Sequence, residues 1–87
     1  MPKMIVQHTV QDFSKWKSVF DSVHSLRKQF GCTGEEVFQG HQNPKAVVII
    51  THWGNLDQAQ KYGQSPEMKD AMQKAGVLGP PTIDFVK

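Results

Sequence analysis

The stretch VVIITHWGNLDQAQKYGQSP, residues Val47–Pro66, decides the fold of this chain. Its first half is rich in β-branched and apolar residues and predicts a strand over Ala46–Trp53. Asn55 is a favourable N-cap residue, so we expect a helix over Leu56–Gln64 to begin directly after it. The stretch therefore predicts a buried strand that ends in a tryptophan and turns at once into a short helix.

A second helix and a final strand follow. Ser65 is another N-cap residue and Pro66 suits the first helical position, so a helix is predicted from there to the stop at Gly76. Residues 79–81, Gly-Pro-Pro, predict a rigid extended connection, because proline fixes its own backbone angle and restricts the residue before it. The chain then ends in a predicted strand over 82–86.

Three elements are predicted ahead of this stretch. Alternating apolar residues indicate a strand over Lys3–Val10, and the adjacent Val37 and Phe38 indicate the centre of a second strand over 33–41. Between them, apolar residues recur every three or four positions over 13–30, which predicts one long helix with Asp12 as its N-cap. Gly31 suits the left-handed residue that commonly follows a helix, so the helix is expected to stop there.

The predicted order is strand, helix, strand, strand, one or two helices, strand. This βαββα(α)β order is typical of a ferredoxin-like α+β domain, with an antiparallel sheet and helices on one face, and residues 1–87 are expected to form a single domain. In the strand over Ala46–Trp53, apolar residues fall at odd and even positions alike, so both faces should be covered. We therefore expect a homodimer in which two sheets pack face to face.

Size and composition narrow the class of protein. A chain of 87 residues buries only about 60–65 % of its unfolded surface, so association of two copies would add needed burial. A net charge of +2 with dispersed lysines argues against a nucleic-acid partner. The single cysteine, Cys32, fits a reducing compartment, and no apolar run is long enough for a membrane helix. A cytoplasmic protein without a membrane or nucleic-acid partner is expected.

These residues resemble the dimeric α+β barrel superfamily, and within it the antibiotic-biosynthesis-monooxygenase-like (ABM) proteins. The resemblance rests on the strand that ends in Trp53, on Asn55 and Tyr62, and on the pair Ser65-Pro66. The order of elements extends it over the whole chain. It implies a site between the helices and the sheet of each subunit. Members include cofactor-independent oxygenases of aromatic polyketides, haem-degrading enzymes and polyketide cyclases, so the resemblance leaves the reaction open.

His8 and Tyr62 are the candidate catalytic residues. His8 lies on the strand face assigned to the helix side, where an apolar surrounding would leave a neutral imidazole able to take a proton from a phenol or enol. Tyr62 matches a site tyrosine of the plant polyketide cyclases that the chain resembles, and its hydroxyl would orient a substrate. Those cyclases carry histidines where this chain has Met4 and Met68, which argues against their mechanism. The alternative is that both side chains simply pack in the core.

Five residues are candidates for binding an aromatic substrate: Trp53, Trp16, Phe20, Thr51 and Asn55. In the oxygenase branch that the chain resembles, a tryptophan and an asparagine help to bind the substrate, which would make Trp53 a pocket wall. Trp53 is equally explained as a core residue, and Asn55 as a helix cap. Arg27 lies at the edge of the apolar stripe of its helix, where it is either a solvated charge or a group that holds an anionic substrate at the cleft mouth.

These residues favour a cofactor-independent monooxygenase, or a related cyclase or isomerase, that acts on a small aromatic or polyketide-like molecule. No cofactor and no metal is expected, because the four histidines lack metal-ligand spacing and Cys32 has no second thiolate with it. Two alternatives remain: a protein that binds a small apolar ligand without chemistry, and a dimeric scaffold with a filled core.

Overall fold

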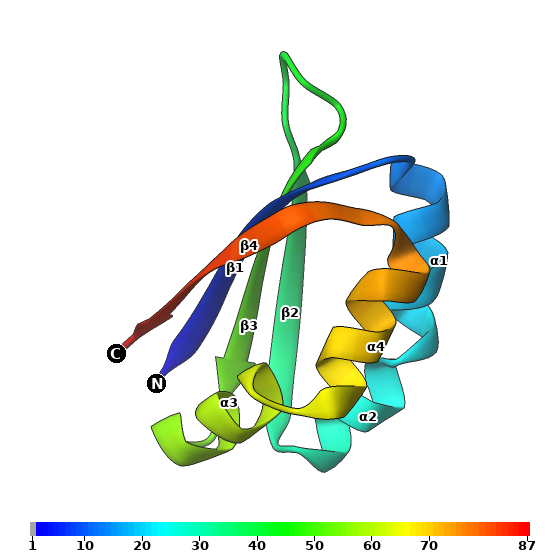
Figure 1. Cartoon of the computed structure of the whole chain (residues 1–87). Coiled ribbons are helices and arrows are strands. Elements are labelled where there is room, and N and C mark those ends of the chain that lie inside the picture. The colour runs from blue at the N-terminus through cyan, green and yellow to red at the C-terminus, as the bar shows by residue number, and fades with distance from the viewer. Residues whose placement is uncertain (1) are drawn as a thin grey trace.

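A computed structural model describes residues 2–87 of the chain. Along this part, strands and helices follow one another in the predicted order, except that two helices stand between the first two strands where one was predicted (Figure 1). The elements are β1 (Lys3–Val10), α1 (Phe13–Ser22), α2 (His24–Gln29), β2 (Cys32–Gln39), β3 (Ala46–Trp53), α3 (Leu56–Gly63), α4 (Pro66–Ala75) and β4 (Val77–Val86). None of the helices within residues 2–87 is long and apolar enough to cross a membrane.

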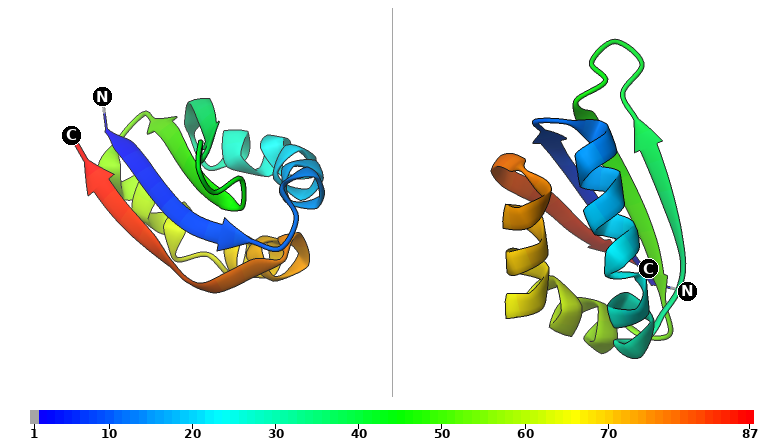
Figure 2. Two further views of the ribbon diagram at one scale, coloured as in Figure 1. Left: turned by 90° about the horizontal axis from the view of Figure 1, so that it is seen from above. Right: turned by 90° about the vertical axis from the view of Figure 1, so that its right-hand side faces the viewer.

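The four strands form one antiparallel sheet in the order β2-β3-β1-β4. This order places β1 and β3 at the centre and β2 and β4 at the edges. The helices lie together on one side of the sheet, and the other side has no cover within the described chain (Figure 2). The predicted ferredoxin-like α+β fold is therefore confirmed.

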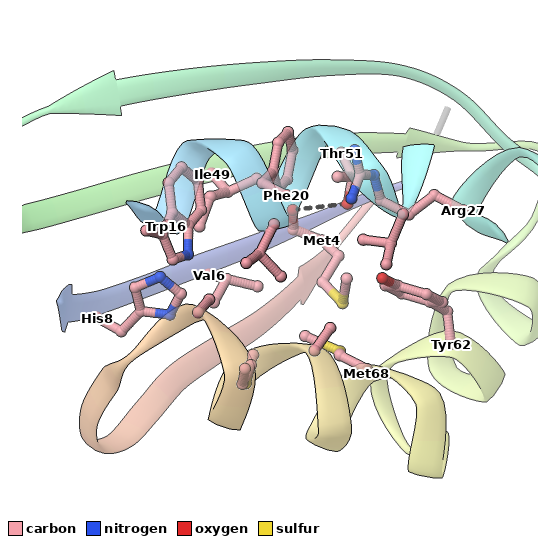
Figure 3. Close-up of a pocket in the computed structure, with 15 residues that line it drawn as sticks. Met4, Val6, His8, Trp16, Phe20, Arg27, Ile49, Thr51, Tyr62 and Met68 are labelled. Atoms are coloured by element: carbon pink, nitrogen blue, oxygen red, sulfur yellow. Dashed lines mark hydrogen bonds between the residues drawn. The ribbon is translucent and has the colours of Figure 1, made fainter. Parts of the chain in front are cut away.

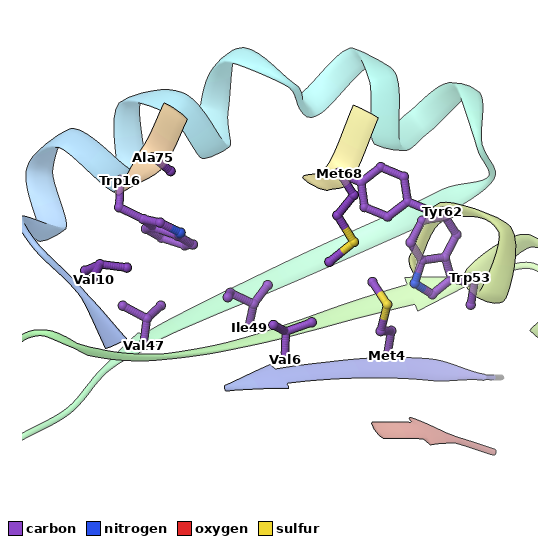
Figure 4. Close-up of a cluster of buried hydrophobic side chains, with 11 residues drawn as sticks. Met4, Val6, Val10, Trp16, Val47, Ile49, Trp53, Tyr62, Met68 and Ala75 are labelled. Carbon is purple, nitrogen blue, oxygen red and sulfur yellow. The ribbon is translucent and has the colours of Figure 1, made fainter. Parts of the chain in front are cut away.

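The core lies between the sheet and the helices, on the face where every second strand residue points (Figure 4). β3 alternates regularly, with Val47, Ile49, Thr51 and Trp53 buried and the residues between them half-buried. Trp53 is fully enclosed, and burying an apolar side chain of this kind contributes about 1.5–3 kcal/mol or more. The face that carries Trp53 is therefore the inner face of β3.

The predicted single helix over 13–30 is wrong, because the chain breaks at Val23 into α1 and α2. The Ser22 hydroxyl donates to the Val19 carbonyl at 2.6 Å, and the Val23 amide bonds the Phe20 carbonyl, one residue short of the α-helical partner. A serine hydroxyl that bonds a backbone carbonyl competes with the helical ladder. The apolar periodicity continues through this break, which explains why the sequence pattern does not reveal it.

The last strand is longer than predicted, since β4 begins directly after the left-handed Gly76 and includes residues 79–81. The prediction of a separate connection at this Gly-Pro-Pro segment is therefore wrong. Prolines are tolerated here because β4 is an edge strand, but they cannot donate to the ladder. The register with β1 shifts accordingly: Gln7 pairs with Thr82 and Thr9 with Leu78, so three residues of β4 pass opposite His8.

The face of the sheet away from the helices carries apolar side chains from all four strands. Ile5 of β1 and Ile50 of β3 are neighbours there and are half-buried. Phe38, Leu78 and Val86 are the large apolar residues most exposed on this face, at 49 %, 44 % and 37 %. An apolar face of this extent, open to water, is typical of a surface that associates.

Candidate functional site

A cavity lies between the inner face of the sheet and the helices (Figure 3). Its interior measures about 60 Å³, and the whole hollow with its open mouth about 480 Å³. The interior alone has room for roughly four to six water molecules, so a ring would also have to use the open mouth of the hollow. A larger ligand would have to push aside the flexible methionines of the wall. The lining includes Met4, Val6, His8, Trp16, Phe20, Arg27, Ile49, Thr51, Tyr62 and Met68.

His8 reaches one end of the cavity from β1, beside Trp16 (Figure 3). Its ring lies edge-on to the indole of Trp16, with centroids 5.7 Å apart and planes at 72°. Both ring nitrogens are buried, and neither has a hydrogen-bond partner. Burial lowers the pKa of His8 below its ordinary value of 6.5, so the imidazole is neutral near pH 7. The unpaired nitrogen of the neutral His8 imidazole can therefore accept a proton from a molecule that enters the cavity.

The backbone at His8 is also irregular. On one side His8 pairs with Val47 of β3, but on the other side the strand β4 passes it with residues 79–81, a Gly-Pro-Pro segment. Gly79 adopts φ +71°, a left-handed conformation that side chains disfavour. Bulges of this kind are over-represented next to active sites, where they re-aim a side chain. The only histidine of the inner face therefore sits at the only register shift between β1 and β4 within the described chain.

Tyr62 reaches the cavity from α3, near the other end (Figure 3). Its ring packs against Trp53 at 5.4 Å between centroids and edge-on against Phe30 at 5.3 Å. Burial raises the pKa of the Tyr62 hydroxyl, and the nearby Arg27 opposes that rise only in part. The hydroxyl is therefore protonated at neutral pH and can donate a hydrogen bond to a ligand oxygen.

Arg27 lies near Tyr62 and is 2 % exposed, in spite of its charge. Its Nε donates to Glu35 Oε2 at 2.6 Å, and its guanidinium lies 3.7 Å from the centroid of the Phe20 ring. The second oxygen of Glu35 lies 2.8 Å from His24 Nδ1. Although burial works against the charge on Glu35, the bonds from Arg27 and His24 hold the pKa of its carboxyl below the usual range. Arg27 is therefore a paired charge inside the protein rather than the solvated charge that its sequence suggests.

Trp16 and Phe20 form an aromatic wall on α1. Their rings stack with centroids 5.0 Å apart and planes at 22°. Both residues line the cavity, and Trp16 is almost completely buried. The Phe20 ring thus contacts both Trp16 and the Arg27 guanidinium, and the two aromatic side chains form an apolar wall between the ends of the cavity.

The other three candidates are placed differently from one another. Thr51 lines the cavity, and its hydroxyl donates to the Met4 carbonyl at 3.3 Å and accepts from Trp53 Nε1 at 2.8 Å. Trp53 itself lies behind Tyr62 and is not among the lining residues. Asn55 is exposed and caps α3 by accepting from the Gln58 amide at 2.9 Å. The structure therefore brings together His8, Tyr62, Trp16, Phe20 and Thr51, and leaves Trp53 and Asn55 in supporting positions.

Sequence reasoning undervalued Arg27, which carries the only formal charge among the cavity residues of the described chain. One signal was present: Arg27 follows Phe20 by seven positions, which places both residues on the same helical face. Its partner Glu35 belongs to β2, so the pair forms only when that strand folds back against the helix. Within residues 2–87, no group of three His, Cys, Asp or Glu side chains gathers in a way that would hold a metal ion.

The sequence model of one family matches the chain. It is the family of antibiotic biosynthesis monooxygenases, and the match covers residues 12–74, which is more than half of the chain. A search of curated protein sequences found no match.

Several solved structures share the fold over nearly the whole chain. A protein of Bordetella bronchiseptica, described provisionally as an antibiotic biosynthesis monooxygenase, has a TM-score of 0.82 and 15 % identity over 99 % of this chain and 94 % of that one. SnoaB, a cofactor-independent oxygenase from Streptomyces nogalater, has a TM-score of 0.76 and 13 % identity over 99 % and 92 %. A conserved protein from Methanosarcina mazei Go1 has a TM-score of 0.67 and 15 % identity over 99 % and 90 %. At such identities the likeness shows the fold alone.

Proposed function

This chain belongs to the antibiotic biosynthesis monooxygenase family, and we propose that it is a cofactor-independent oxygenase of a small aromatic or polyketide-like compound. The observation that carries the proposal is His8, a neutral imidazole at the wall of an apolar cavity with neither ring nitrogen paired. A buried polar group without a partner costs about 1–3 kcal/mol, which a purely structural residue has no reason to retain. The description of SnoaB as a cofactor-independent oxygenase supports the same reading.

His8 acts as the general base in this proposal. It takes a proton from an acidic phenol or enol of the substrate, and its own lowered pKa keeps it unprotonated and ready at neutral pH. The charge remaining on the substrate is a delocalised oxyanion. The Tyr62 hydroxyl donates a hydrogen bond to a substrate oxygen and so stabilises this anion in a water-poor site.

Dioxygen then reacts with the electron-rich anion, so no bound cofactor has to supply electrons. In the net reaction, a ring CH₂ of the substrate becomes C=O, one oxygen atom enters the product, and the second leaves as water with the two hydrogens removed from carbon. Trp16 and Phe20 offer an apolar wall against which the substrate ring packs. The protein's part is binding, orientation, proton removal and exclusion of water.

Oxygen consumption with a panel of naphthols and related phenols tests this proposal. The His8→Ala variant is expected to lose turnover while keeping the circular dichroism spectrum and the assembly of the parent protein. The His41→Ala variant serves as a matched control, because His41 is exposed and outside the cavity. Unchanged turnover in His8→Ala would remove the base from the mechanism. Saturable binding of the phenols without any oxygen uptake would leave the alternative function, a small-ligand-binding protein of the same fold.

We further propose that the chain works as a homodimer through the open face of its sheet. Ile5, Ile50 and the exposed Phe38 form an apolar surface on the face of the sheet that the helices leave uncovered. A second copy would cover it with the same residues, as expected for a two-fold interface. Sedimentation of Ile50→Lys should give a monomer, whereas the control Gln73→Lys on the exposed side of α4 should remain a dimer. A parent protein that sediments as a monomer would contradict the proposal.

A further inference from the structure

The cavity contains a buried cation that the proton transfer proposed above does not use. Arg27 is 2 % exposed and lines the cavity close to Tyr62 (Figure 3). Its Nη2 is completely buried and has no hydrogen-bond partner. Buried guanidinium N–H groups are normally all paired, so this donor is available for an acceptor that enters the cavity.

The charges around the cavity favour an acidic ligand. Of the 15 residues that line it, Arg27 alone carries a formal charge, and no Asp or Glu is among them. Tyr62 adds a second donor near Arg27, because burial keeps its hydroxyl protonated. An anion that enters would therefore meet donors at one end and apolar side chains elsewhere, and the nearest carboxylate, Glu35, lies outside the lining and is already bound to Arg27 Nε.

Arg27 is held in place from two sides. Glu35 accepts from its Nε at 2.6 Å, and the ring of Phe20 lies 3.7 Å below the guanidinium. Both contacts fix the plane of the guanidinium. Because they involve Nε and the face of the group, they leave the hydrogens of Nη2 free to donate. A donor that is already oriented loses little entropy when a ligand binds, which raises affinity for that ligand.

We propose that Arg27 and Tyr62 together recognise a planar carboxylate of the ligand, which accepts from Arg27 Nη2 and from the Tyr62 hydroxyl. The inference rests on the proposed function and adds to it the class of molecule: an aromatic acid rather than a neutral arene. The acid group occupies the Arg27 end, and the ring extends along the wall formed by Phe20 and Trp16 towards His8. Recognition at one end thus decides which carbon or oxygen of the ring meets the base at the other end.

Benzoate and benzamide test the inference, because they have nearly the same shape and differ in charge. Binding of each is measured at pH 8 by isothermal titration calorimetry to the parent protein and to Arg27→Gln. We expect the parent protein to bind benzoate at least tenfold more tightly than benzamide, and Arg27→Gln to lose that preference. The control Lys28→Gln removes the neighbouring exposed charge on the same helix and should keep the preference.

A second variant, Glu35→Gln, should change the affinity for benzoate in the opposite direction. It also tests the inference if Arg27→Gln does not fold. Glu35→Gln keeps an acceptor for Arg27 Nε but removes the negative charge that compensates the guanidinium, so benzoate should bind several-fold more tightly. A purely structural role of the pair would instead weaken binding of both probes in both variants. If Arg27→Gln does not fold, tighter binding by Glu35→Gln supports the inference, and unchanged or weaker binding overturns it.

The outcomes separate this inference from the proposed function. Equal binding of benzoate and benzamide in the parent protein overturns the carboxylate preference and leaves an oxygenase of neutral phenols untouched. A carboxylate preference without oxygen uptake on any hydroxybenzoate or naphthol upholds the inference and removes the oxygenase. Binding of neither probe overturns the carboxylate site, whereas phenol turnover would still uphold the oxygenase.

Discussion

The two ends of the cavity each bury a polar side chain, but they treat it in opposite ways. At one end, His8 has no partner for either ring nitrogen, and burial lowers its pKa so that it stays neutral. At the other end, Arg27 keeps its charge because Glu35 lies 2.6 Å away and compensates it. Burying the unpaired but neutral imidazole costs less free energy than burying an unpaired charge would, which is why the guanidinium has a partner and the imidazole has none.

This difference shows how one small cavity holds a base and a cation together. An unpaired neutral imidazole costs about 1–3 kcal/mol, which a folded domain can bear. An unpaired buried guanidinium would cost more, so its counter-charge on β2 is part of the site although it lies outside the cavity lining. The free energy of unfolding of variants at Glu35 and at His8 therefore tests the two ends without a ligand.

The largest effect is expected when the Arg27 end loses its counter-charge. Glu35→Ala leaves the guanidinium buried and unpaired, and should lower the free energy of unfolding by about 3 kcal/mol. Glu35→Gln keeps an acceptor for Arg27 Nε but removes the counter-charge, so it should lose less, about 2 kcal/mol. Urea denaturation followed by tryptophan fluorescence measures both changes.

The neighbouring Glu36→Ala is the control for this change. Glu36 points to the opposite face of the sheet and is about half exposed, with His52 at 3.4 Å, so its removal should change stability by less than about 0.5 kcal/mol. Equal losses for Glu35→Ala and Glu36→Ala would show that Glu35 does not compensate a buried charge.

A smaller effect of opposite sign is expected at the His8 end. His8→Phe replaces two unpaired nitrogens by an apolar ring beside Trp16, and should raise the free energy of unfolding by about 1 kcal/mol. The same variant should lose the proposed oxygen uptake, which would show a site that sacrifices stability for activity. A loss of stability would indicate that His8 makes a favourable interaction in solution that the unpaired nitrogens do not reveal.

The contrast between the ends also explains what the sequence could predict. Strand alternation places His8 on the same face as Val6 and Val10, so its inward position follows once that face is assigned to the helices. The residue type of Arg27 predicts a solvated side chain, because charged side chains are rarely buried. Its burial depends on Glu35, a contact between α2 and β2 that no local pattern encodes.

Trp53 shows a second limit of sequence reasoning. Alternation in β3 places Trp53 on the same face as Val47 and Ile49, and the structure shows that this face is the inner one. Whether it lines the cavity depends on how α3 docks, because Tyr62 of that helix comes between Trp53 and the hollow. The break at Val23 was equally hidden, since side-chain hydrogen bonds to the backbone leave the apolar period unchanged.

The smallest expected effect is a dependence of stability on pH that belongs to His8. Because the pKa of His8 in the folded protein lies below its ordinary value of 6.5, the unfolded chain takes up a proton first as the pH falls. His8 therefore contributes nothing to the pH dependence above about pH 7.5, and lowers stability progressively as the pH falls through and below 6.5. Urea denaturation between pH 8 and pH 5.5 should show a smaller loss for His8→Phe than for the parent protein. His41→Phe, an exposed control, should follow the parent protein, and parallel curves for the parent and His8→Phe would mean that His8 is not buried in the neutral form.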